Sequence, residues 1–322
     1  MENRYRPRRT VLSVPGSSAK MIEKAKSLPA DEVFLDLEDA VAPDAKAEAR
    51  TAVAAALAEP GWSGQLRGVR VNDWTTPWTH ADVIEVVSAV GSARDASLDI
   101  VVLPKVTDVS HIQAMDLLLT QLEAMHGLPV GGIGIEAQIE NAQGLTNIDA
   151  IAAAPRVQAL VLGPADMAAS LNMRTLEVGE QPEGYDVGDA HHYVLMRILI
   201  AARTHGIPAI DGPFLKIRDV DGFRRVAGRS AALGYDGKWV LHPDQIAAGN
   251  EIFSPRQKDY DHAELILEAY EWHTSRAGGA RGAAMLGDEM IDEASRKMAL
   301  VIAGKGRAAG MVRKEPPFQP PS

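Results

Sequence analysis

Short apolar runs alternate with longer amphipathic stretches along most of the chain. The runs are rich in Val, Ile and Leu and carry few polar residues, as expected of parallel strands covered on both faces. The pattern predicts eight strands, at residues 11–14, 33–37, 68–71, 100–103, 132–139, 157–162, 207–210 and 239–241. The stretches between them have helical periodicity. They predict helices at residues 18–27, 44–58, 79–90, 109–125, 144–153, 166–171, 191–205 and 220–233.

This alternation predicts an α/β protein with a (β/α)8 TIM barrel, and 322 residues is an ordinary length for that fold. A doubly wound nucleotide-binding sheet is not supported, because no G-x-G-x-x-G motif follows the first strand. About 80 residues remain after the last strand, with predicted helices at 260–275 and 292–303 and a Gly/Ala/Arg linker at 277–284. We therefore expect a barrel over residues 1–254, a C-terminal helical arm or lid over 255–310, and a disordered proline-rich tail over 311–322.

Composition narrows the function. The net charge of −10 opposes binding to nucleic acid and anionic membranes, so an anionic ligand needs a local basic pocket. The chain has no cysteine, which excludes disulfides, zinc–thiolate sites and a cysteine nucleophile. It has no apolar run long enough for a membrane span, and the basic N-terminus is not followed by the apolar region of a signal peptide. We expect a cytoplasmic enzyme.

Acidic side chains follow several of the predicted strands. In a TIM barrel these strand ends meet at one mouth, where carboxylates repel each other unless a cation lies among them. Glu140 and Asp166 end adjacent strands, and oxygen ligands of this kind suit Mg²⁺. The alternative is that the mouth carboxylates form ion pairs with Arg70 and Lys105. The acidic residues at the predicted mouth are Asp36, Glu38, Asp39, Glu140, Asp166 and Asp211.

Seven motifs, in order along the chain, resemble the citrate lyase β-subunit-like family, also called the HpcH/HpaI aldolase family. They lie at residues 8–17, 35–41, 70–72, 139–140, 163–166, 236–243 and 253–255, and the resemblance extends from about residue 9 to 303. Members of this family are acyl-CoA lyases on TIM barrels, malyl-CoA lyase among them. None of the motifs is decisive alone, but seven in register are specific.

The resemblance implies roles for the matching positions. Glu140 and Asp166 correspond to the family's two metal carboxylates, and Arg70 to an arginine that contacts the thioester oxygen. Asp292 matches an acid/base aspartate supplied by the neighbouring subunit's C-terminal arm, although the sequence is equally consistent with a helix N-cap. Substrate-binding roles are implied for Ser13, Lys24, Arg70, Ala165, Asp166, Leu241 and His242, and positions near the site for Glu38, Asp39 and Lys46.

One position departs from the pattern of some malyl-CoA lyases, which have arginine where this chain has Ser18. Either Lys20 takes over that role or CoA binds more weakly.

The resemblance predicts a Mg²⁺-dependent carbon–carbon lyase, with Mn²⁺ as a substitute ion, acting on L-malyl-CoA and also β-methylmalyl-CoA. The products would be glyoxylate with acetyl-CoA or propionyl-CoA. Three alternatives stay open: a malyl-CoA thioesterase, a citramalyl-CoA lyase, and a citrate lyase β subunit in a larger complex. One methyl group gives only about 1–3 kcal/mol of discrimination, so the sequence does not separate the lyases. We expect a homotrimer or homohexamer, whose neighbouring subunits complete each active site.

Overall fold

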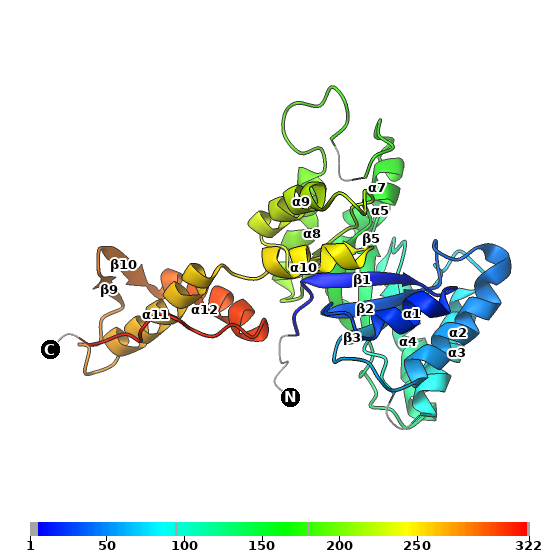
Figure 1. Cartoon of the computed structure of the whole chain (residues 1–322), viewed down its shortest axis with the longest axis horizontal. Helices are drawn as coiled ribbons and strands as arrows, with labels where there is room; N and C mark the ends of the chain where they lie inside the picture. The colour runs from blue at the N-terminus through cyan, green and yellow to red at the C-terminus, as the bar shows by residue number, and fades with distance from the viewer. Residues whose placement is uncertain (1–5, 94–95, 179–180, 321–322) are drawn as a thin grey trace. The chain divides into compact units, whose positions relative to one another are not determined.

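The computed structural model describes residues 6–93, 96–178 and 181–320. Its largest element is a closed barrel of eight parallel strands in chain order, in which β1 pairs with both β2 and β8. The predicted TIM barrel is confirmed (Figure 1). The strands are β1 (Thr10–Pro15), β2 (Glu32–Asp36), β3 (Leu66–Arg70), β4 (Ile100–Leu103), β5 (Gly134–Ile139), β6 (Val157–Leu162), β7 (Ala209–Asp211) and β8 (Gly237–Val240).

Alternate residues of the strands fill the barrel interior, because successive side chains of a strand point to opposite faces. Phe34 and Trp239 are the largest of them, with ring centroids 5.0 Å apart. The interior cluster consists of Val11, Phe34, Ile100, Val102, Ala159, Val161, Ile210 and Trp239. The same parity continues along each strand, so polar residues two positions beyond these apolar ones also face the barrel axis.

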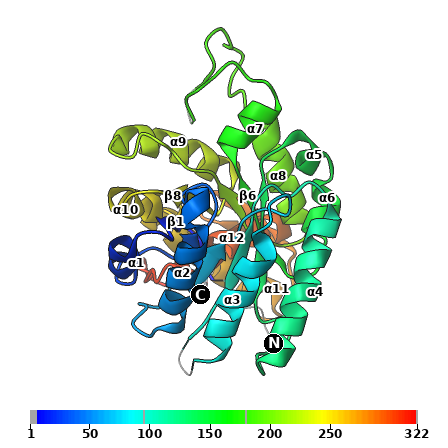
Figure 2. The ribbon, with the colours of Figure 1, turned by 90° about the vertical axis from the view of Figure 1, so that its right-hand side faces the viewer.

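Helices surround the strands, with α1, α9 and α10 on one side in Figure 2 and α4 and α6 on the other. Asp108, Asn141 and Asp219 cap three of them, each accepting a hydrogen bond from a backbone N–H of the first turn. The helices of the barrel are α1 (Ala19–Ala25), α2 (Lys46–Ala58) after the 3₁₀ turn η1 (Pro43–Ala45), α3 (Thr79–Gly91), α4 (Val109–Met125), α5 (Ala142–Thr146), α6 (Ile148–Ala152), α7 (Pro164–Ser170), α8 (His192–Thr204), α9 (Val220–Leu233) and α10 (Pro243–Ile252).

Two helix predictions for the barrel are corrected. The single helix expected over residues 144–153 is broken into α5 and α6 at Asn147, whose amide donates to the carbonyl of Thr107 at 2.8 Å. Helix α10 was not predicted. It begins at Pro243, and Gln245 in its first turn accepts a hydrogen bond from the N–H of Leu241 at 2.8 Å. In both cases the helix boundary is set by a side-chain hydrogen bond to the backbone of a residue outside the helix.

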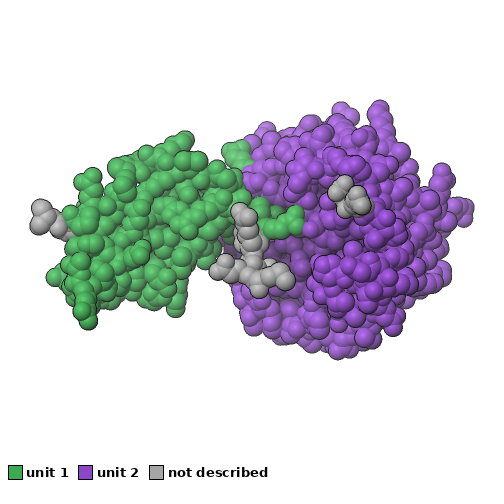
Figure 3. All heavy atoms as spheres, turned by 90° about the horizontal axis from the view of Figure 1, so that it is seen from below, with its two compact units in different colours: residues 1–7, 251–322 green, residues 8–250 purple. Residues whose placement is uncertain are grey.

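The chain divides into two compact units, residues 8–250 and residues 251–322 with 1–7 (Figure 3). In the second unit, α11 (Gln257–Thr274) packs against α12 (Glu293–Ala308) and a hairpin of β9 (Ala283–Leu286) and β10 (Glu289–Asp292). This hairpin was not predicted, and it overlaps the expected linker at residues 277–284. The core of the unit consists of Ala263, Ile266, Ala269, Tyr270, Ile291, Ala299 and Ala303.

A disordered tail was expected over residues 311–322, of which 321 and 322 lie outside the described residues. Residues 311–320 contact α11. The backbone N–H of Lys314 donates to Asp261 at 3.0 Å, and that of Phe318 donates to Glu268 at 2.7 Å. The Phe318 ring packs against the same helical core. No helix among the described residues is long and apolar enough to cross a membrane.

Candidate active site

Strand pairing brings an arginine and a carboxylate together at the mouth of the barrel. Asp36 and Arg70 are register partners on β2 and β3, and both side chains face the interior. Arg70 donates from Nε and Nη2 to the two carboxylate oxygens of Asp36, at 2.8 and 2.6 Å. A bidentate pair of this kind is strong and directional. The pairing of β2 with β3 therefore fixes the position of the Arg70 guanidinium.

The same guanidinium also contacts Glu38 and the ring of Trp239. Its Nη1 lies 2.5 Å from Oε2 of Glu38, and its carbon lies 5.1 Å from the centroid of the ring. Burial opposes its charge, but the carboxylates of Asp36 and Glu38 outweigh burial and raise the pKa of Arg70, which stays protonated. The two hydrogen bonds to Asp36 use two of the five N–H groups of the guanidinium.

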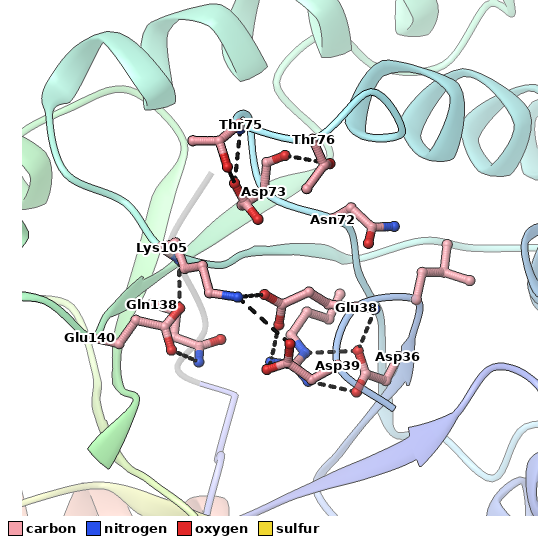
Figure 4. Close-up of polar contacts among 12 residues, drawn as sticks. Asp36, Glu38, Asp39, Asn72, Asp73, Thr75, Thr76, Lys105, Gln138 and Glu140 are labelled. Atoms are coloured by element: carbon pink, nitrogen blue, oxygen red, sulfur yellow. Dashed lines mark hydrogen bonds and ion pairs between the residues drawn. The ribbon is translucent and has the colours of Figure 1, made fainter. Parts of the chain in front are cut away.

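Lys105 extends this cluster toward the fifth strand (Figure 4). Its ammonium group forms an ion pair with Glu38 and lies 3.6 Å from Asp39. Its backbone N–H donates to Oε1 of Glu140 at 2.6 Å. One residue thus connects the Arg70 cluster to Glu140. The alternative that mouth carboxylates pair with Arg70 and Lys105 is confirmed for Asp36 and Glu38.

Glu140 is a buried carboxylate with little to neutralise it. It is 2% exposed, and burial, followed by the charges of Glu38 and Asp166, raises its pKa to about 8. Its Oε2 accepts from Nε2 of Gln138 at 2.5 Å. Gly163 directly follows β6, and a Cβ added there would lie 2.2 Å from Oε2 of Glu140. Only glycine leaves room for this carboxylate.

Glu140 and Asp166 fit a hard divalent cation. Asp166 lies in the first turn of α7, half-buried, and is close enough for its charge to raise the pKa of Glu140. A cation between them would offset the burial and the neighbouring negative charges that raise the pKa of Glu140. Among the described residues no group of three or more His, Asp or Glu side chains forms a metal cage. Mg²⁺ does not need one, because it commonly takes one or two carboxylates and completes its octahedron with water and substrate oxygens.

The other predicted site residues lie on separate elements. Ser13 is half-buried on β1, Lys24 is exposed in the last turn of α1, and Ala165 is exposed beside Asp166 on α7. Leu241 and His242 follow β8, and Nδ1 of His242 accepts from the N–H of Asp244 at 3.2 Å.

Asp292 lies in the C-terminal unit. It caps α12, accepting from the N–H of Ser295 at 3.0 Å in a capping box. The N-cap interpretation of this residue is therefore confirmed.

Asp211 does not join the mouth, which corrects one expectation. Ile210 faces the barrel interior, so the next side chain points outward to the helices. There Asp211 pairs with the buried Lys238 at 2.5 Å, beside a cavity of about 50 Å³ lined by residues of α8 and α9. A strand of three residues gave no alternation from which this orientation could be predicted.

Two supporting residues emerge from the structure. Gln138 was not predicted, although it lies two positions before Glu140 on β5 and so shares its face. Lys46 was expected near the site, and its ammonium group donates to the carbonyls of Leu37 and Glu38, both at 2.7 Å. Burial lowers the pKa of Lys46. This lysine holds the turn that carries Glu38.

Comparison with known proteins gives consistent results. The family model described as HpcH/HpaI aldolase/citrate lyase matches residues 9–243. An L-malyl-CoA/beta-methylmalyl-CoA lyase of Cereibacter sphaeroides is 40% identical over 92% of this chain and 94% of its own. A (3S)-malyl-CoA thioesterase of the same species is 33% identical, covering 84% of this chain and 86% of its own.

A solved structure is also similar: protein CitE from Mycobacterium tuberculosis in complex with magnesium, acetoacetate and coenzyme A. Its TM-score is 0.69, with 26% identity over 94% of this chain and 98% of that one.

Proposed function

The chain belongs to the HpcH/HpaI aldolase/citrate lyase family, and on that premise we propose that it is a carbon–carbon lyase that cleaves L-malyl-CoA to acetyl-CoA and glyoxylate. Its second substrate would be β-methylmalyl-CoA, which gives propionyl-CoA. The similarity to a lyase with these two substrates, over nearly the full length of both chains, supports this assignment. The structural observation that carries it is the buried Glu140 beside the Arg70 cluster at the strand ends.

We assign Glu140 and Asp166 to Mg²⁺, which Mn²⁺ would replace because both ions prefer oxygen ligands. When bound, the ion supplies a Lewis acid and a template for the hydroxyl and carboxylate oxygens of the substrate. The chain's own part is to hold the Glu140 carboxylate in place through hydrogen bonds from Lys105 and Gln138. The bound magnesium in the similar CitE structure supports the choice of ion.

Arg70 would stabilise the charge that develops during cleavage. The bond between the α and β carbons of the thioester breaks, and its electron pair moves onto the thioester as an enolate. The β-hydroxyl gives its proton to a water or a carboxylate at the mouth and becomes the aldehyde of glyoxylate. Donors aimed at a developing oxyanion are often the largest single contribution to catalysis. Arg70 has N–H groups beyond the two that donate to Asp36, and its pairing with Asp36 keeps the guanidinium oriented.

Asp292 would protonate the enolate carbon, or remove that proton in the condensation direction. The proposal rests on the family resemblance, and it includes a homotrimer or homohexamer in which the arm of one subunit serves the barrel of another. The remaining predicted positions, Ser13, Lys24, Ala165, Leu241 and His242, would bind the CoA ester. A cytoplasmic location also stays a prediction.

The deciding experiment is product analysis after incubation of the purified protein with L-malyl-CoA and Mg²⁺. We expect glyoxylate and acetyl-CoA, no activity after treatment with EDTA, and recovery with Mg²⁺ or Mn²⁺. Malate and free CoA as products would instead identify a thioesterase, an alternative favoured by the 33% identical relative. Full activity in metal-free protein would refute the roles of Glu140 and Asp166.

The shared site is tested by mixing two inactive variants. Asp292→Ala keeps the barrel and loses the acid/base group, whereas Glu140→Ala loses the metal site and keeps the arm. After verified subunit exchange, mixed oligomers should recover part of the activity. If each arm served its own barrel, every subunit in the mixture would remain broken, so no recovery would refute the shared site.

A further inference from the structure

Lys105 adopts a backbone conformation that a lysine rarely takes. Its φ is +52°, in the left-handed region. A residue with a Cβ is sterically strained there, whereas glycine is not. Lys105 directly follows Pro104 at the end of β4. Residues held in such conformations persist only where surrounding contacts compensate for the strain, and they are frequent at functional sites.

In this conformation the backbone N–H of Lys105 points away from the neighbouring strand and toward a side chain. Strand β4 pairs with β5 up to Leu103, and beyond the turn Val106 donates again to the backbone carbonyl of Gln138 at 3.3 Å. Between them, the N–H of Lys105 donates to the carboxylate of Glu140 at 2.6 Å instead of to the backbone. In a regular strand, the N–H of Lys105 would donate to a backbone carbonyl of β5. The left-handed conformation directs it to the carboxylate of Glu140 instead.

The side chain of Lys105 runs toward a different group. Its ammonium pairs with Glu38, which also contacts Arg70 at 2.5 Å. Backbone and side chain of one residue thus hold two carboxylates that differ in role. Glu140 is the metal carboxylate of the proposed function, and Glu38 supports Arg70.

We propose that Lys105 is a positioning residue with two separable parts: its left-handed N–H holds Glu140 for the divalent cation, and its ammonium group holds Glu38 and, through it, Arg70. This inference rests on the proposed function for the identity of the cation. Neither part needs contact between Lys105 and the substrate. The two parts predict different results for different substitutions.

Three variants separate the parts. Lys105→Val removes the ammonium group and disfavours the left-handed backbone, because a β-branched residue tolerates positive φ poorly. Lys105→Met removes only the ammonium group and keeps length and N–H. Lys105→Gly also keeps the N–H and adopts positive φ without strain. Mg²⁺ affinity of each purified enzyme is measured by titration calorimetry without substrate, with the melting temperature as the control for folding.

We expect Lys105→Val to bind Mg²⁺ about 10- to 100-fold more weakly, the usual cost of losing a partner of a metal-binding carboxylate. Lys105→Met and Lys105→Gly should bind it as the wild type does, while their kcat falls about tenfold because Glu38 and Arg70 are less well held. Wild-type kcat in Lys105→Met would overturn the side-chain part. Equal Mg²⁺ affinities of the Val and Met variants would overturn the backbone part.

If Lys105→Val does not fold, Lys105→Gly decides the backbone part. Retained Mg²⁺ affinity supports it, and a loss of more than about tenfold overturns it, since glycine preserves the N–H and its direction. Failure of wild-type protein to bind Mg²⁺ would refute both this inference and the proposed function. Mg²⁺ binding that responds as expected, without cleavage of malyl-CoA, would refute only the proposed substrate.

Discussion

The two ends of the barrel interior carry similar charged residues and differ in their access to solvent. At the end opposite the mouth, Arg8 donates from Nε to Glu136 at 2.7 Å and to Glu32 at 3.2 Å, and from Nη2 to Gln158 at 3.3 Å. Glu32 and Glu136 are 0% exposed. At the mouth, the side chains of Lys105 and Asp39 are 35% and 62% exposed.

The same strands supply both clusters. Strand β2 begins at Glu32 and ends at Asp36, and Glu136 and Glu140 lie four positions apart on one face of β5 and its extension. Around Arg8, burial and the neighbouring Glu136 raise the pKa of Glu32 well above its ordinary value. Both glutamates of that cluster are closed off from solvent. Similar residue types become a candidate site only where solvent, substrate and a cation have access.

The largest difference should appear when each end loses one glutamate. Glu140→Gln should reduce kcat/KM on the order of 1,000-fold at moderate Mg²⁺, because a Lewis acid supplies several kcal/mol of transition-state stabilisation. Glu136→Gln, its matched control, should leave turnover within about twofold because the closed end has no contact with substrate. Kinetics with malyl-CoA at several Mg²⁺ concentrations measure both. Comparable losses in the two variants would remove the functional distinction between the ends.

The two arginines give a second, smaller contrast. Arg70→Lys should lose on the order of 100-fold in kcat, because the planar fork is lost from a charge-stabilising position. It should also lose about 1–3 kcal/mol of unfolding free energy, because the buried carboxylate of Asp36 loses a hydrogen bond. Arg8→Lys should keep its turnover and lose about 1–3 kcal/mol of unfolding free energy, as buried carboxylates lose hydrogen bonds. Denaturant unfolding and steady-state kinetics are compared for both. Wild-type turnover in Arg70→Lys would assign that residue to structure alone.

Glu32, at the closed end of the barrel, should make the free energy of unfolding depend on pH. The pKa of Glu32 is higher in the folded than in the unfolded protein, so folding takes up a proton between these two values. The free energy of unfolding should therefore fall as pH rises above about 4.5, with a slope of up to about 1.4 kcal/mol per pH unit from this group. Glu32→Gln should flatten that slope, as measured by urea unfolding from pH 5 to 9. An unchanged slope would mean that Glu32 is ionised in the folded state.

Much of the fold and part of the site could be predicted from sequence. The barrel strands are apolar runs whose length and composition suit burial on both faces, so they were located to within a few residues. Glu140 and Asp166 could be paired because adjacent parallel strands end at the same edge. The hairpin at residues 283–292 was missed because its short strands are mostly exposed and lack a clear alternating pattern.

The barrel, its chain-order topology and the residue types at its strand ends could all be inferred without coordinates, since they follow from local periodicity and short connections. Which of those residues share a face depends on how the strands are packed. Asp211 points outward while Asp36 and Glu140 point inward, because a one-residue change of parity reverses a side chain's direction. The tertiary structure alone also gave Lys105 its positive φ, since the contacts that hold it come from β2 and β5, distant in sequence. Local preference would have made that lysine extended; the packed barrel mouth holds it otherwise.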